Sequence, residues 1–219
     1  VIANFQTIFN LITAIVLLPF TNYLVKIACK IVKDDKKEEV VYPELAALDK
    51  KLMISPAVAL AEVTNVAVTM AEMAKENFGR GYQQFKKYDA KMTVEINTAE
   101  DRLDSFTDRA DNYLIELSRH IEKEFNKRHL NMLMQCIRDV ERIGDYATNL
   151  EELAKQLSKT DIEFSKGARD ELQILVNAIV EILRLTVEAI ETDSETVTRR
   201  IEPLEEVIDD MVLLLKNRH

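Results

Sequence analysis

The chain has 219 residues, of which 47% are hydrophobic and 31% are charged, while only four are glycine and four are proline. This length fits one sizeable domain or two small ones, and so few helix-breaking residues favour long helices over a turn-rich β fold. A net charge of −9 and the lack of tryptophan argue against a nucleic-acid partner, because neither a basic surface for phosphates nor a stacking platform for bases is present. The two cysteines, Cys29 and Cys136, are isolated in the sequence, which is typical of a reducing compartment.

Residues 1–25, VIANFQTIFNLITAIVLLPFTNYLV, carry no charge. As a helix they would reach about 37 Å, enough to cross the hydrocarbon core of a bilayer. Five lysines follow between residues 26 and 37, and the positive-inside rule then places the rest of the chain in the cytoplasm. We therefore predict a transmembrane helix over residues 1–33. A buried helix of a soluble domain is the alternative, while a signal peptide is disfavoured because its basic residues would precede the apolar stretch.

The residues that follow this stretch predict a linker and then a helical domain. Residues 34–54 mix both signs of charge and contain a Tyr-Pro step, which favours a linker. Because the chain opens with valine inside an apolar stretch, we expect it to be a piece of a longer protein. The first 42 residues contain five lysines and four acidic residues, so the helical part that follows has 24 basic and 34 acidic residues.

Apolar residues at helical spacing continue from residue 55 to the end of the chain. Ser55 and Pro56 predict the start of a helix that runs to Phe85, with Gly79 and Gly81 expected to loosen its last turns. Further helices are predicted over residues 88–122, 125–157, 168–191 and 194–219, and Pro203 is expected to kink or restart the last of them. Long helices joined by short loops predict an all-α, antiparallel bundle.

An internal repeat divides this bundle. The segment AEDRLDSF at residues 99–106 aligns with LEEVIDDM at residues 204–211, an offset of 105 residues that pairs Leu103 with Ile208. A unit of three helices therefore begins a second time. We predict a domain of tandem three-helix repeats over residues 55–219, with the first repeat at 55–160 and an incomplete second repeat at 161–219.

Acidic side chains recur on these helices beside the face that carries the apolar residues. At 100° per residue, they form stripes that flank the predicted core instead of lying opposite to it. Gly144 is expected on the core side of its helix, where the missing side chain would let another helix come close. Carboxylate and amide oxygens are hard ligands that suit a metal ion, and such an ion could offset the repulsion between the acids. The predicted ligands are Glu100, Asp104, Glu141, Asp145, Asn149, Glu205 and Asp209. The alternative is a solvated acidic face on which Arg138 and Arg142 pair with Glu141.

The string ERIGDYATN, residues 141–149, resembles the signature helix of PhoU-like phosphate-uptake regulators. The acid-x-x-x-Asp pairs Glu100/Asp104 and Glu205/Asp209 are similar to the other acidic motifs of that family. The resemblance implies a fold of two three-helix repeats and metal ions bound through the acidic motifs, in some members as iron clusters. It also implies regulation of phosphate transport and signalling rather than catalysis. The metal is left open among Fe, Mg, Mn, Ca and Zn.

A second resemblance concerns the apolar stretch. ANFQTIFNLITAIVLLPF is similar to the last membrane helix of bacterial sodium-dependent phosphate cotransporters, except that Gln6 stands where histidine is expected. In that family a PhoU-like domain follows in the same polypeptide, and LDKKLMISPAVALAEVTNVAVTMAEMA looks like its beginning. The resemblance implies an inner-membrane protein whose helical domain is cytoplasmic, with sodium and phosphate handled by a transporter region upstream. A homodimer is left open.

Two other classes of protein compete with this interpretation. A di-iron four-helix enzyme would need Glu-x-x-His on two helices, and none of the three histidines has an acid three residues before it. The second alternative is a membrane-anchored helical signalling or scaffolding module without a ligand, which strict heptads would favour. No nucleophile elbow, phosphate-binding glycine loop or HExxH motif indicates an enzyme.

Overall fold

The computed structural model describes residues 42–160, 163–192 and 194–218, together with Gln6, Phe9, Thr13, Phe20 and Tyr23. The chain divides into two units, residues 1–41 and residues 42–219. Apart from those five residues, the predicted transmembrane helix and the first part of the predicted linker lie outside the described residues.

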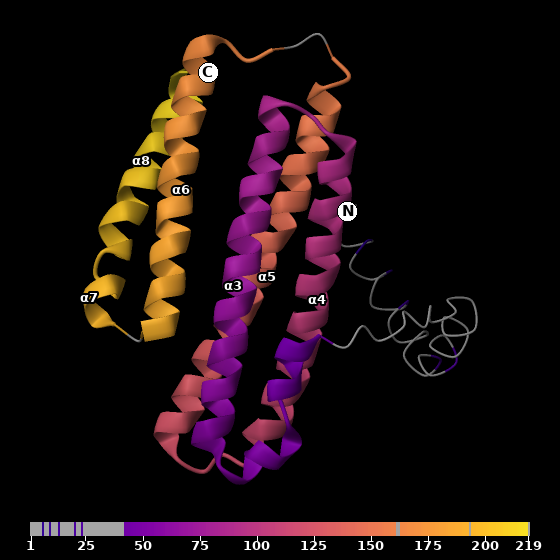
Figure 1. Ribbon diagram of the computed structural model, residues 1–219, viewed down its shortest axis with the longest axis vertical. Helices are drawn as coiled ribbons and strands as arrows, with labels where there is room; N and C mark the ends of the chain where they lie inside the picture. The colour runs from indigo at the N-terminus through magenta and orange to yellow at the C-terminus, as the bar shows by residue number, and fades with distance from the viewer. Residues whose placement is uncertain are drawn as a thin grey trace. The chain divides into compact units, whose positions relative to one another are not determined.

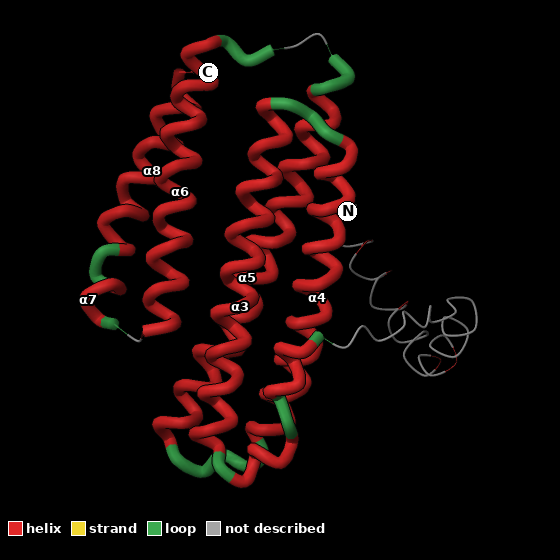
Figure 2. The backbone as a smooth tube through the Cα atoms, in the orientation of Figure 1, coloured by secondary structure: helices red, strands yellow, loops and turns green. Residues whose placement is uncertain are grey.

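The unit formed by residues 42–219 is a bundle of long helices that run antiparallel to their neighbours in sequence (Figure 1). Figure 2 shows helices and loops and no strand in the described part of the chain. The predicted all-α, antiparallel bundle is therefore confirmed. Its elements are the short 3₁₀ helices η2 (Pro43–Ala47) and η3 (Lys50–Ile54), and the α-helices α3 (Pro56–Lys86), α4 (Ala90–Ser118), α5 (Glu124–Leu157), α6 (Lys166–Thr192), α7 (Glu195–Thr198) and α8 (Ile201–Arg218).

Helix starts follow the local sequence signals. Ser55 is the N-cap residue of α3 and Pro56 its first helical residue, as the sequence predicts. Asp89 caps α4 by accepting a hydrogen bond from the backbone N–H of Lys91 at 2.9 Å. Pro203 lies in the first turn of α8, where a proline is tolerated, so the last helix restarts there.

Helix α3 is the central element of the bundle, since it packs against α4, α5 and α6. Its buried side chains are mostly small or medium-sized, among them Ala59, Leu60, Val63, Ala67 and Met70. Among the described residues α3 is the one helix long and apolar enough to cross a membrane, and its place at the centre of the bundle also accounts for that composition. The helix continues through both glycines to Lys86, next to the predicted end at Phe85.

The second half of the predicted linker, residues 43–54, is part of the bundle, which corrects that prediction. Leu48 and Met53 are buried in the hydrophobic core. On α4, the Arg102 guanidinium lies 3.0 Å from the Glu44 carboxylate. The apolar residues of this segment have the core to bury into, so the segment folds onto the bundle instead of remaining a linker.

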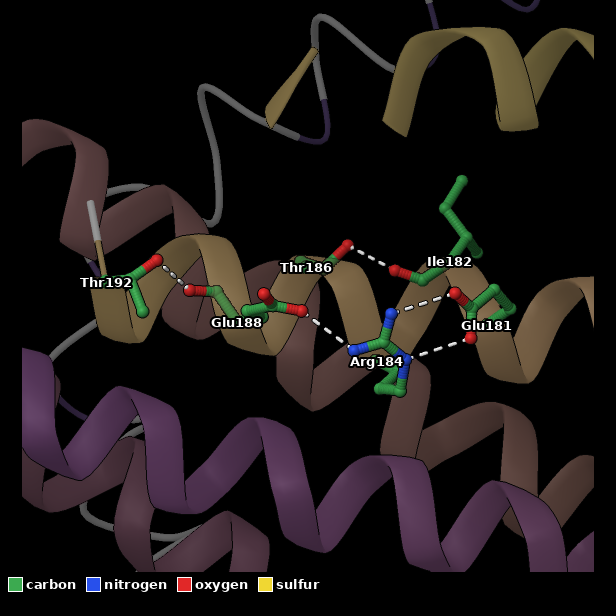
Figure 3. Close-up of polar contacts among 6 residues, drawn as sticks. All are labelled: Glu181, Ile182, Arg184, Thr186, Glu188 and Thr192. Atoms are coloured by element: carbon green, nitrogen blue, oxygen red, sulfur yellow. Dashed lines mark hydrogen bonds and ion pairs between the residues drawn. The ribbon is translucent and has the colours of Figure 1, made fainter. Parts of the chain in front are cut away.

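Helices α6 and α8 pack against each other as an antiparallel pair joined through α7 (Figure 1). On the surface of α6, the Arg184 guanidinium donates hydrogen bonds to Glu181 at 2.9 Å and to Glu188 at 2.8 Å (Figure 3). These hydrogen bonds raise the pKa of Arg184 above its already high ordinary value. Because all three side chains are at least partly exposed, they stabilise one helix locally and form no binding site.

Candidate functional site

The acidic stripe of α4 lies beside the face that the helix buries. Leu103, Phe106 and Ala110 are buried, whereas Glu100 is half-buried and Asp104 is exposed. Residues three and four positions apart share one side of a helix, so the acids follow one edge of the α4 core face. The sequence prediction of acids flanking the core agrees with this burial pattern.

On α5 the predicted ligands lie beside the contact with α4. Glu141 and Asp145 are half-buried, and Asn149 is exposed. Gly144, between the two acids, is buried, and a Cβ atom added there would overlap the Cδ2 atom of Leu103 on α4. The glycine therefore lets α4 and α5 approach closely, as its position on the core side predicted.

The acids of the two helices lie within each other's electrostatic reach, and we call Glu100, Asp104, Glu141 and Asp145 the acidic seam. Partial burial is the main reason why the pKa of Glu100 is raised, and repulsion from Asp104 raises it further. Repulsion from Asp145, on the other helix, adds to the raised pKa of both Glu100 and Asp104, in each case after burial. Burial and then Asp145 and Asp104 likewise raise the pKa of Glu141.

Asp111, seven residues after Asp104 on α4, lies beyond the end of the seam and was not among the predicted ligands, although its spacing from Glu100 places it on the same stripe. Its Oδ1 atom is buried and has no hydrogen-bond partner among the described residues. Burial raises the pKa of Asp111, while the positive charge of Arg138 on α5 lowers it. A buried carboxylate oxygen without a donor is costly, so this end of the seam has capacity for one more interaction.

The third predicted pair, Glu205 and Asp209, lies apart from the seam. Both side chains are exposed on α8, which packs mainly on α6. The structure therefore does not bring them to the acids of α4 and α5. Ile208 of α8, the residue that the repeat pairs with Leu103, is partly buried, whereas Leu103 of α4 is fully buried, and the tandem repeat stays a prediction.

The donor chemistry of the seam suits a hard cation, because every candidate atom is a carboxylate or amide oxygen. Among the described residues, however, no group of three or more His, Cys, Asp or Glu side chains is arranged to hold a metal ion. The acids of the two helices repel one another but form no such group. Metal binding therefore stays a prediction.

The fold is an all-α antiparallel bundle, and the acidic seam lies between two of its helices. Residues 67–154 match the family model of the PhoU domain. The match runs from the middle of α3 through α4 to the last turn of α5, so it contains the whole acidic seam. No curated relative and no solved structure matches the chain. The match supports a PhoU-like domain over these residues, as the ERIGDYATN resemblance predicted.

Proposed function

We propose that this chain carries the cytoplasmic regulatory domain of a sodium-dependent phosphate cotransporter of the inner membrane, and that the domain modulates phosphate uptake. The observation that carries the proposal is the PhoU match over α3, α4 and α5, which contains the acidic seam. The uncharged stretch at residues 1–25 and the five lysines that follow support the membrane context. Sodium and phosphate would be handled by a transporter region of the same polypeptide.

The proposal includes a metal ion at the acidic seam. Glu100 and Asp104 from α4 and Glu141 and Asp145 from α5 would supply carboxylate oxygens, with Asn149 within the same stripe. The raised pKa values of Glu100, Asp104 and Glu141 reflect partial burial together with repulsion, which a cation would offset. Since the carboxylates do not converge as they lie, binding requires side-chain rotation at the surface of the seam.

The contacts of α4 suggest how the seam could communicate with the membrane region. The side of α4 away from the acids holds residues 43–54, through the Arg102–Glu44 pair and through the Tyr113 hydroxyl, which donates to the backbone carbonyl of Asp49 at 3.0 Å. A cation that draws the acids of α4 toward α5 would act on the same helix that anchors this segment. Movement of α4 would then be transmitted toward the apolar stretch.

Metal titration of the purified chain tests the proposed site. We expect elemental analysis to find a bound metal after purification without chelator, and thermal unfolding to shift upward with added Mn²⁺ or Mg²⁺. At a cation concentration of about 100 times Kd the gain is about 2.7 kcal/mol. Asp145→Asn should abolish most of this shift, whereas Asp139→Asn, the same substitution at an exposed position of α5, should retain it.

Phosphate uptake by the complete transporter tests the regulatory part. Asp145→Asn should change the uptake rate or its response to phosphate supply, and Asp139→Asn should not. A metal-free wild-type protein with no cation-dependent shift, combined with unchanged uptake by Asp145→Asn, would refute the assignment of the seam.

A second candidate function is a membrane-anchored helical signalling or scaffolding module without a ligand. It is favoured by the lack, among the described residues, of three converging metal-binding side chains. Exposed apolar side chains on α8, Leu213 and Leu214, would then serve contacts between proteins. Sedimentation analysis separates the two functions, since this module should self-associate and show no response to cations.

A further inference from the structure

A cavity lies at the end of the bundle where α3 and α5 end and α6 begins, away from the middle of α4 and α5, where the acidic seam lies (Figure 1). Its volume is about 300 Å³, and its walls come from residues 84–88, from the end of α5, from the connection between α5 and α6, which includes Phe164, and from the start of α6. This volume is at the lower end of the range for small-molecule sites. Residues 84–88 are distant in sequence from the other walls, which lie in or beside the connection between α5 and α6, so the cavity forms only when α3 packs against that connection.

The charge around this cavity is opposite to that of the domain. Lys86, Lys87 and Arg169 line it, with Glu163 as the acidic residue of the wall. A broader hollow of about 790 Å³ shares Lys86 and Lys87 and adds Lys91. The helical part of the chain has 34 acidic and 24 basic residues, so its net charge is negative. The cluster of basic side chains at the cavity has the opposite charge and favours binding of an anion.

Asp89, an acidic residue of the broader hollow, already accepts a hydrogen bond within the protein. Its carboxylate accepts the hydrogen bond from the backbone N–H of Lys91 that caps α4. That carboxylate therefore has a structural role in starting the helix, while no hydrogen bond or ion pair to an acid is found for Lys87 or Arg169 among the described side-chain contacts. These two cations are the groups most available to an incoming anion.

The apolar part of the wall indicates that the anion has an organic body. The rings of Phe85 and Phe164 lie 6.4 Å apart between centroids, at an interplanar angle of 55°, and both line the cavity beside Leu157. A bare inorganic anion would leave these apolar groups unused. A phosphate ester could place its phosphate on the cations and its apolar or aromatic part on the rings.

Buried hydrogen bonds hold the turn that carries the two lysines. The side chain of Gln84, only 2% exposed, accepts from the backbone N–H of Asp89 at 2.7 Å and donates to the backbone carbonyl of Asp89 at 3.0 Å. Its amide also donates to Thr93, whose hydroxyl donates to the buried Glu151 of α5 at 2.7 Å. The turn is therefore fixed to α4 and α5 before any ligand arrives, which lowers the entropy cost of binding.

We propose that this cavity binds a small phosphate ester, with Lys87 and Arg169 contacting the phosphate and Phe85 and Phe164 contacting its apolar part. The proposal rests on the geometry of the cavity alone and stands whether or not the acidic seam binds metal. The same chemistry is available from a soluble nucleotide and from a lipid headgroup, and the two sources differ in the body attached to the phosphate.

Isothermal titration calorimetry of the full chain tests this site with four probes: adenosine 5′-monophosphate, adenosine, inorganic phosphate and the water-soluble lipid dihexanoyl phosphatidylglycerol. We expect the nucleotide or the lipid to bind more tightly than adenosine and inorganic phosphate. Preference for the nucleotide would indicate a soluble ligand, and preference for the lipid would indicate a headgroup site. Either result supports a phosphate-ester site.

Three variants, one of them a control, locate the binding. Lys87→Gln/Arg169→Gln should weaken binding of the preferred probe by about tenfold or more, because two charge-assisted contacts are lost. Lys127→Gln, which removes an exposed lysine near the other end of α5, should leave it unchanged. Phe164→Ala should weaken binding of the preferred organic probe and leave the weak binding of inorganic phosphate unchanged.

The proposal is overturned if neither ester gives saturable binding. It is also overturned if adenosine binds as tightly as its monophosphate, or if Lys127→Gln weakens binding as much as the double variant. Tighter binding of inorganic phosphate than of both esters would likewise overturn it. Circular dichroism confirms that each variant is folded, and wild-type binding should weaken as salt concentration rises.

Discussion

Gly79 and Gly81, two residues apart on α3, should respond in opposite ways to substitution by alanine: one variant should be more stable than the wild type and the other less stable. A Cβ atom added at Gly81 would lie 2.8 Å from the carbonyl oxygen and 3.2 Å from the Cα atom of Ala147 on α5. At Gly79 nothing lies within 4 Å of the added atom. Both positions are helical, so both alanine variants gain the same intrinsic helix propensity, about 1 kcal/mol.

The difference between the variants comes from packing. Overpacking a tight site costs about 1–3 kcal/mol, and backbone atoms of Ala147 cannot rotate away as a side chain would. Since α3 and α5 form the most extensive helix pair of the bundle, moving them apart disturbs many other contacts. We therefore expect Gly79→Ala to stabilise by about 1 kcal/mol and Gly81→Ala to destabilise by about 1–3 kcal/mol.

Thermal unfolding of the full chain, followed by far-ultraviolet circular dichroism, measures this difference. A gap of about 2–4 kcal/mol corresponds to about 4–16 °C between the two midpoints. Gly144→Ala provides an intermediate case, because the atom it meets is the end of the Leu103 side chain and can shift. If Gly81→Ala unfolds at or above the temperature of Gly79→Ala, the close approach of α3 and α5 is not as described here.

Two further predictions concern buried and partly buried acids. Thr93→Val removes the hydroxyl that donates to Glu151, a carboxylate 4% exposed, and should lower the free energy of unfolding in urea by about 1–3 kcal/mol, whereas the exposed Thr98→Val on the same helix should change it by less than about 0.5 kcal/mol. The pKa of Glu100 and of Glu141 is raised in the folded protein, first by burial and then by neighbouring acids. The folded state therefore binds more protons than the unfolded state between the ordinary glutamate pKa, about 4.3, and the raised values, so these groups reduce stability as pH rises through that window. Replacing both by glutamine should raise the urea midpoint at neutral pH in chelator-treated protein and flatten its pH dependence, and a variant as pH-dependent as the wild type would contradict this.

The sequence by itself determined the helical class, the starts of the helices and the side of each helix that carries acids. These features depend on local chemistry: the first-turn proline at Pro56, the 3.6-residue period and the spacing of Glu141 and Asp145. Gly144 could be placed on the core side for the same reason, since its angular position follows from its neighbours on α5. The PhoU signature was readable because it lies within one continuous helix.

Tertiary structure decided every feature that depends on which helix faces which. Periodicity places Gly79 and Gly81 on different sides of α3, but only the structure shows that Gly81 meets the backbone of another helix and that Gly79 meets nothing. The sequence predicts a linker at residues 43–54, whereas in the folded structure this segment buries Leu48 in the core. The cavity beside Arg169 combines residues 84–88 with the connection between α5 and α6, and no local pattern encodes their proximity. Periodicity fixes the direction of a side chain relative to its own helix, whereas the partner it meets is set by long-range packing.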